Sequence, residues 1–171
     1  MVQLTPVTKF HSGSGYQYED TVIYGFAHTS KGHWNLCHIP LLPVTGTVTP
    51  DDYSSGYSHE NESAHPGYYQ VYLERYDINT ELTSTLRCAF HKYTFKPGVS
   101  KKLVANLLMS NEKVRDWAIQ REGENVFTGF QETASLAPRP MSPVPFYFHF
   151  LVFTFTFSVS LENPIHKLYG K

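Results

Sequence analysis

The residues best suited to ligand binding or catalysis lie in two short polar segments, GHWN at 32–35 and HENE at 59–62. In the first, Trp34 follows a glycine and stands between His33 and Asn35. An indole ring can pack against the apolar C–H face of a pyranose while neighbouring donors and acceptors bind its hydroxyls. The same pattern also fits a loop tryptophan that folds back into the core, and the local residues do not separate the two.

The second segment, His59-Glu60-Asn61-Glu62, carries two carboxylates and an imidazole. Glycoside hydrolysis needs two carboxylates across the scissile bond, one as acid and one as base or nucleophile. Glu60 and Glu62 point the same way if the backbone there is extended. Paired glutamates are also common on solvated surfaces, so this pair alone does not predict catalysis. Asn61-Glu62-Ser63 fits the N-glycosylation pattern, which matters only in a eukaryotic secretory setting.

Metal and cofactor signals are weak. His28, His33 and His38 lie five residues apart, which matches neither HExxH nor a zinc pattern, and such loop histidines are more often exposed or hydrogen-bonded. Cys37 and Cys88 share no CxxC spacing and fit two buried thiols better than a disulfide. The chain has no glycine-rich phosphate loop and no GxSxG. We therefore expect neither a metal site nor a catalytic residue on this chain.

The composition favours strands and excludes some partners. The chain has 171 residues, is 15% aromatic and carries a formal net charge of −1. Aromatic side chains fit pleated surfaces, and this length predicts one domain with a substantial core. The near-zero charge gives no electrostatic case for binding nucleic acid or an anionic membrane. No signal peptide precedes the first strand, and the longest apolar stretch, 146–161, is too short for a membrane helix.

The elements that must position these residues are strands. Alternation of apolar and polar residues is clearest from Ile78, where Leu82, Leu86, Cys88 and Phe90 share one face. The opposite face carries the set Asn79, Glu81, Thr83, Thr85, Arg87 and His91. Parity reverses at Tyr93, which predicts a bulge or bend near Lys92.

The remaining elements are shorter or less regular. Two prolines make 39–44 an edge strand at best. The segment 103–109 is apolar on both faces and predicts a central strand, or else a short buried helix. Residues 111–119 fit one helical turn or a further strand. Further strands are predicted at 21–26, 68–75 and 146–161. Turns at short intervals make the whole chain, 1–171, a single antiparallel β-sandwich domain.

Two longer blocks resemble a known family. GYQYEDTVIYGFAHTSKG at 15–32 is similar to a block of glycoside hydrolase family 92, the calcium-dependent exo-α-mannosidases. YSSGYSHENESAHPGYYQVYLERYDINTELTSTLRCAFHKYTF at 53–95 resembles that family's next block, with SHENE, PGYY and ELT in order. Ala27 stands where the family usually has Ser. The likeness is strong over 1–133 and weak over 134–171.

The resemblance implies the N-terminal β-sandwich domain of an inverting α-mannosidase, trimmed at both ends. In the family a helical domain supplies the acid and base carboxylates and binds calcium, so the resemblance implies no cofactor on this chain. It implies a substrate pocket at the interface of the two domains, to which the sandwich lends loop residues. Trp34 is then the sugar-contacting aromatic and His33 a hydroxyl partner. His28 and Asp20 match motif positions and are expected to position that loop.

Three functional hypotheses follow. The first is a domain that contributes to an α-mannoside pocket, has the missing helical domain as its partner and is not catalytic alone. The second is an independent carbohydrate-binding sandwich. The third is a fragment whose exposed edges and apolar surface make it unstable. Family members are usually periplasmic or secreted, but without an export signal the compartment stays open.

Overall fold

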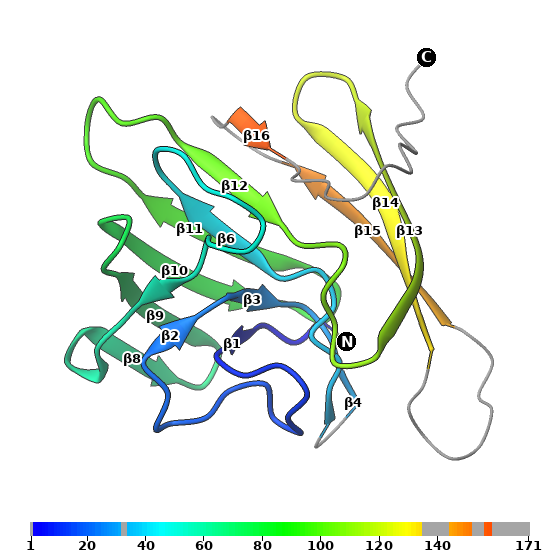
Figure 1. The fold of residues 1–171 in the computed structure, drawn as a ribbon, viewed down its shortest axis with the longest axis horizontal. Coiled ribbons are helices and arrows are strands. Elements are labelled where there is room, and N and C mark those ends of the chain that lie inside the picture. Colours follow the sequence, from blue (N-terminus) through cyan, green and yellow to red (C-terminus); the bar gives the residue numbers. More distant parts are fainter. Residues whose placement is uncertain (1, 32–33, 135–143, 152–155, 159–171) are drawn as a thin grey trace.

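The computed structural model describes residues 2–31, 34–134, 144–151 and 156–158. Within these ranges the chain is built of strands, and its helical element is one 3₁₀ turn, η1 (His59–Asn61). Figure 1 shows two larger sheets lying over one another and a smaller sheet to one side. The predicted all-β, antiparallel sandwich is confirmed. No helix in the described part of the chain is long and apolar enough to span a bilayer.

The largest sheet has five strands, and we call it the central sheet. Its order is β1 (Thr5–Val7), β3 (Gly25–Ala27), β6 (Leu41–Val44), β12 (Lys102–Ala105) and β16 (Thr156–Ser158), and only β12 and β16 run parallel. The four-stranded sheet is β11 (Ala89–Thr94), β10 (Ile78–Ser84), β9 (Tyr68–Leu73) and β8 (Glu62–His65). The three-stranded sheet is β13 (Lys113–Glu122), β14 (Val126–Ala134) and β15 (Val144–Leu151). Two short pairs complete the fold, β2 (Val22–Ile23) with β7 (Ser55–Gly56) and β4 (Ser30–Lys31) with β5 (Trp34–Asn35).

The central sheet is covered on both faces. On one face Leu42, Val44 and Val104 pack with buried residues of the four-stranded sheet, among them Val71 and Ile78. Side chains that alternate with these point the other way. They form a second core with the three-stranded sheet, made of Ile39, Leu41, Leu103, Ala105, Leu107, Ile119 and Phe148. Burial on both faces explains why β6 and β12 are apolar without alternation.

The prediction of an edge strand at 39–44 is wrong, because β6 lies between β3 and β12. Its two neighbours cover different lengths of it. β12 pairs with all four residues, whereas β3 pairs only where Phe26 faces Leu41.

The predicted continuous face from Ile78 to Phe90 is also wrong. Ile78 and Leu82 are buried, but the chain reverses after Ser84, where the Thr85 amide donates to the Cys88 carbonyl at 2.8 Å. The strand after this reversal, β11, points His91 and Tyr93 inward and leaves Phe90 exposed. The change of parity therefore comes from a hairpin and needs no bulge near Lys92.

Three further expectations are resolved by the structure. The segment 103–109 is a strand only to Ala105, and 111–119 lies largely in β13. The predicted strand at 146–161 is two strands, β15 and β16, with 152–155 and 159–161 outside the described residues. Both cysteines are free, but only Cys37 is buried and Cys88 is exposed, so the expectation of two buried thiols holds for one of them.

The two-sided core predicts a large stability cost for Phe26→Ala. Phe26 is fully buried on β3, and removing its ring leaves a cavity between the two large sheets. We expect the free energy of unfolding, measured by urea denaturation, to fall by about 3–5 kcal/mol. The same substitution at Phe90, which is 55% exposed, should change it by no more than about 0.5 kcal/mol. Equal effects at the two sites would contradict the packing described above.

Candidate functional site

Trp34 lies in a two-residue strand pair next to the central sheet. β4 and β5 pair with Ser30 opposite Asn35, and the Ser30 hydroxyl donates to the Trp34 carbonyl at 3.2 Å. Trp34 is partly exposed, so it is not sealed in the core as a plug would be. His33, the predicted hydroxyl partner, and Gly32 lie outside the described residues.

The segment that follows Trp34 is fixed by buried amides. The Asn35 backbone amide donates to the Gly13 carbonyl at 2.7 Å, and its side chain accepts from the Cys37 amide at 2.8 Å. Asn111, fully buried on the connection before β13, donates to the Asn35 carbonyl at 2.7 Å and to the Ser12 carbonyl at 2.8 Å. Asn111 thus holds two backbone segments together, the loop at Ser12 and the Trp34 segment at Asn35. It lies 76 residues beyond Asn35 in the sequence.

The backbone of this segment is strained. Cys37 and Ile39 have φ of 52° and 47°, in the left-handed region that residues with a Cβ rarely adopt. The strain is greatest for Ile39, because its side chain branches at Cβ. The Ile39 amide is held by the Gln131 side-chain oxygen at 3.2 Å, and the Gln131 amide nitrogen donates to the Leu107 carbonyl at 2.9 Å. Strained residues held by their surroundings cluster at functional sites, so this segment is the strongest candidate for a binding loop.

His38 extends the same network. Its two ring nitrogens contact the hydroxyls of Thr29 at 2.9 Å and Thr133 at 3.2 Å, and the Thr133 hydroxyl donates to Glu112 at 2.9 Å. His38, Thr133 and Glu112 are all buried. This histidine therefore serves as a hydrogen-bonding spacer between the Trp34 segment and β14.

His28 lies directly before the Trp34 hairpin and is buried against the four-stranded sheet. Its Nε2 lies 3.0 Å from Nε2 of His91, whose Nδ1 is 2.8 Å from the Tyr93 hydroxyl. Two ring nitrogens at this distance can share one proton but cannot both carry one. Burial lowers the pKa of His28 to about 4. Burial and then the charge of His28 hold the pKa of His91 well below its usual value, so both rings are neutral at pH 7.

Asp20, the other predicted positioning residue, lies in a different cluster. It follows Tyr18 on the loop before β2, and its Oδ2 is buried with no hydrogen-bond partner among the described residues. Burial raises the pKa of Tyr57, with smaller contributions that include the Asp20 carboxylate. The backbone amide of His28 donates to the His38 carbonyl at 3.4 Å, so His28 is adjacent to the Trp34 segment. Asp20 instead lies with the tyrosines near Glu62.

The centre of that cluster is Glu62. Its carboxylate accepts from the Tyr69 hydroxyl at 2.6 Å, the Tyr16 hydroxyl at 3.1 Å and His59 Nδ1 at 2.5 Å. The other His59 nitrogen lies 2.6 Å from the Tyr18 carbonyl, and the Tyr18 ring stacks on the imidazole at 4.1 Å. Both His59 partners are acceptors, so this arrangement favours the protonated ring, which donates from both nitrogens. The hydrogen bond to Glu62 accordingly raises the pKa of His59.

These contacts decide what the HENE segment can do. Three donors occupy the Glu62 carboxylate, and Glu60 is exposed on η1. The two glutamates are therefore not placed as facing acid and base. Among the described residues, no group of three or more His, Cys, Asp or Glu side chains is arranged to hold a metal ion. The resemblance assigns the family's calcium to a helical domain, and that assignment stays an expectation.

The sequence did not point to Asn111, Gln131 or His91 as residues that hold the site. Each is a lone polar residue whose partners lie far away along the chain, 76 residues for Asn111, 92 for Gln131 and 63 for His91. The only available signal was a polar residue within a largely apolar stretch, and that signal is common at strand ends.

The comparisons with known proteins agree with this architecture. Residues 1–160 match the family model described as the glycosyl hydrolase family 92 N-terminal domain. The chain belongs to this family. The resemblance drawn from 15–32 and 53–95 is thereby confirmed. A comparison with curated proteins gives no significant match.

Solved structures place the family 92 domain among larger proteins. A family 92 α-mannosidase from Bacteroides thetaiotaomicron is similar at 26% identity and a TM-score of 0.70, over 77% of this chain and 20% of that one. Its complex with mannoimidazole gives 25% identity and a TM-score of 0.70, over 77% and 19%. An inverting family 92 mannosidase from Bacteroides thetaiotaomicron VPI-5482 shares the fold at 19% identity and a TM-score of 0.65, over 89% and 25%. The chain therefore spans about a fifth to a quarter of the length of these relatives.

The buried histidine pair predicts that the family 92 domain loses stability in acid. In the unfolded chain His28 binds a proton below about pH 6.5, whereas in the folded chain it stays neutral down to about pH 4. The free energy of unfolding therefore decreases as the pH falls from 6.5 to 4. His28→Gln should reduce the slope of the unfolding free energy there by about 1.4 kcal/mol per pH unit. Denaturant titrations across the window measure it. The same change at exposed His65 is the control, and an unchanged slope in His28→Gln would refute the assignment.

The Glu62 cluster predicts the opposite behaviour for His59. Because its raised pKa comes first from Glu62, its stabilising ion pair is present at low pH and is lost as pH rises through the folded-state pKa. An NMR titration of the imidazole should give a midpoint above 6.5 that falls in Glu62→Gln. Glu60→Gln makes the same change on the exposed neighbour and should leave the midpoint nearly in place. A midpoint insensitive to Glu62→Gln would show that the pair does not form in solution.

Proposed function

We propose that this chain acts as the N-terminal domain of an α-mannosidase, lends the Trp34 segment to a mannoside pocket and does not hydrolyse glycosides alone. Family membership carries the proposal, together with similarity to a structure named as an α-mannosidase. The remaining four fifths of that relative supply, on this proposal, the polypeptide that completes the pocket. The chain's own contribution is substrate binding.

The geometry supports Trp34 as the sugar-contacting residue. Its ring is partly exposed, and the backbone behind it is strained and held by Asn111 and Gln131. A fixed aromatic loses little conformational freedom when a sugar packs on it, which favours binding. His33 is proposed as the neighbouring hydroxyl partner. His28 is proposed to hold the start of this hairpin through its link to His91.

The distribution of carboxylates supports a domain that is not catalytic alone. An inverting glycosidase needs two carboxyl groups roughly 6.5–9.5 Å apart, with space for water and substrate between them. Glu62 is engaged by Tyr16, Tyr69 and His59, and Glu60 is turned to solvent. The acid, the base and the calcium site are therefore proposed to lie in a helical partner domain. The domain boundaries are proposed to be those of one sandwich, 1–171.

This function predicts that the chain gives no turnover of an aryl α-mannoside or α-mannobiose with calcium present. The reason is that Tyr16, Tyr69 and His59 occupy the Glu62 carboxylate, while Glu60 is exposed and does not face it as a partner acid or base. Release of the aryl alcohol or of mannose is measured against a complete family 92 α-mannosidase as positive control. Clear turnover that co-purifies with the chain would overturn the non-catalytic part of the proposal.

The role of Trp34 is tested separately by fluorescence, because the chain has two tryptophans, Trp34 and Trp117. Trp117→Phe leaves Trp34 as the reporter, and Trp34→Phe is the matched control. Mannoside at high concentration should change the emission of the first protein and leave that of the second unchanged. A response confined to Trp117 would contradict the proposed contact.

A further inference from the structure

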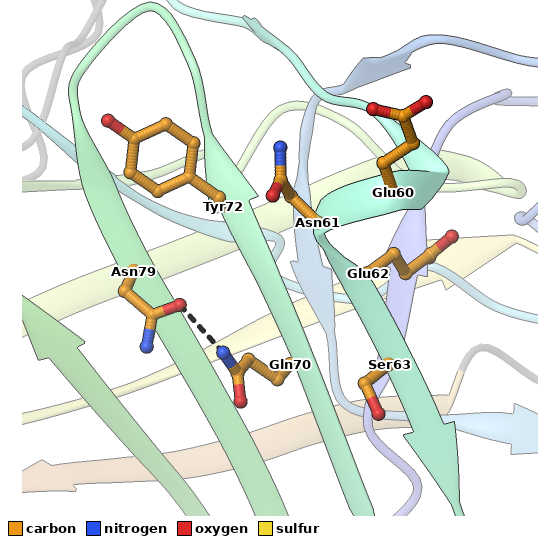
Figure 2. A pocket seen from close by; sticks show the side chains of 7 residues that line it. All are labelled: Glu60, Asn61, Glu62, Ser63, Gln70, Tyr72 and Asn79. Atoms are coloured by element: carbon orange, nitrogen blue, oxygen red, sulfur yellow. Dashed lines mark hydrogen bonds between the residues drawn. The ribbon is translucent and has the colours of Figure 1, made fainter.

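A hollow lies on the outer face of the four-stranded sheet, away from the core. It has a volume of about 430 Å³ and is lined by Glu60, Asn61, Glu62, Ser63, Gln70, Tyr72 and Asn79. That volume falls in the range of roughly 300–1,000 Å³ typical of small-molecule sites. Figure 2 shows these side chains gathered over β8, β9 and β10, with Asn61 between Tyr72 and Glu60.

The lining is chemically suited to sugar hydroxyls. It offers the amides of Asn61, Gln70 and Asn79, the hydroxyl of Ser63 and the ring of Tyr72. Amides and hydroxyls both donate and accept, as sugar hydroxyls do, and an aromatic ring can pack on the C–H face of a pyranose. An outer sheet face needs polar residues for solubility, but it does not need amides on adjoining strands beside an aromatic ring.

The floor of the hollow is held in one arrangement. Ser63 lies opposite Gln70 and Tyr72 lies opposite Asn79, so the groups occupy two adjacent rows across β8 to β10. The Gln70 Nε2 donates to the Asn79 Oδ1 at 3.1 Å (Figure 2). The Tyr68 hydroxyl lies 3.0 Å from the Gln70 Oε1 and 2.9 Å from the Glu81 carboxylate. The bond between the two amides holds Gln70 and Asn79 side by side. Among the described residues, Asn79 Nδ2 and the side chains of Asn61 and Ser63 have no hydrogen-bond partner and are available to a ligand.

The charge pattern favours a neutral ligand over a cation. In Figure 2 the Glu62 side chain points away from the amides, and its carboxylate is bound by Tyr16, Tyr69 and His59. Glu60 is then the single carboxylate of the lining left to a ligand. One carboxylate beside neutral amides is too few hard oxygen ligands for a calcium site of six to eight.

We propose that this outer-face hollow binds a neutral glycan, with one or two sugar residues seated over Gln70, Tyr72 and Asn79. The site goes beyond the proposed function, because β8 and β4 lie at opposite ends of the lower part of Figure 1 and the hollow is separate from Trp34. It gives the chain a glycan contact on its own surface, which the alternative of a carbohydrate-binding sandwich requires. A shallow site for a monosaccharide should have a dissociation constant on the order of 1 mM or weaker.

An NMR titration of the full chain with methyl α-mannoside in EDTA tests the proposal. The side-chain amide signals of Asn61, Gln70 and Asn79 should shift with one saturating curve, and the Trp34 indole signal should not follow it. Gln70→Ala and Tyr72→Ala should each weaken binding roughly 3- to 10-fold. Asn79→Asp keeps the oxygen that accepts from Gln70 and removes the free donor, so it should weaken binding without loss of fold.

Thr94→Ala is the matched control, because Thr94 lies opposite Asn79 in the same row and does not line the hollow. Its binding and melting temperature should match those of the parent chain. The site would be overturned if the amide signals did not shift at methyl α-mannoside concentrations well above the expected dissociation constant. Folded Asn79→Asp and Tyr72→Ala variants with unchanged affinity would also overturn it, as would binding that needs calcium. Shifts at Trp34 alone would overturn this site and leave the proposed function intact. Turnover in the mannosidase assay would overturn the non-catalytic part of the proposed function and leave this site intact.

Discussion

The fold depends on a central sheet that is covered on both faces. β6 and β12 send Leu42 and Val104 into one core and Leu41 and Leu103 into the other, so both faces of these strands are buried except at Lys102, the first residue of β12. Burying a polar group without a partner costs free energy, and such a strand can therefore carry function only at its ends. The Trp34 segment comes immediately before β6, at one such end. The layer that gives the domain its stability thus also limits where polar segments such as the one that contains Trp34 can lie.

The loop at that end is stabilised by hydrogen bonds from distant parts of the chain. Cys37 and Ile39 adopt left-handed backbone conformations that cost on the order of 1–3 kcal/mol each. Buried hydrogen bonds from Asn111 and Gln131 offset that cost, because leaving these amides unpaired would be more unfavourable still. The three-stranded sheet, which supplies Gln131, therefore does more than cover the second core. It fixes the backbone from which Trp34 projects.

The sequence was informative about local alternation and about family. The strand predicted at 68–75 is present as β9, and the two motif blocks predicted the fold and the family. Alternation says which residues of a strand share a face, but it does not say which sheet the strand joins or how many layers cover it. The central place of β6 was missed for that reason, since its prolines argued for an edge. The reversal at Thr85–Cys88 was missed because it has no glycine or proline to mark it.

The second motif block divides its polar residues between the two faces of the four-stranded sheet, and the two groups have different surroundings. Inward-pointing Glu62 is consumed by a tyrosine–imidazolium cluster that joins the loop before β2 to the four-stranded sheet. Outward-pointing Gln70 and Asn79 are held by each other and keep donors for solvent or ligand. A carboxylate whose oxygens are occupied by three donors is poorly placed to contact a substrate oxygen or a catalytic water. The inward face of this block therefore holds the Glu62 cluster, whereas the outward face holds neutral amides beside the ion pair between Glu81 and Lys92.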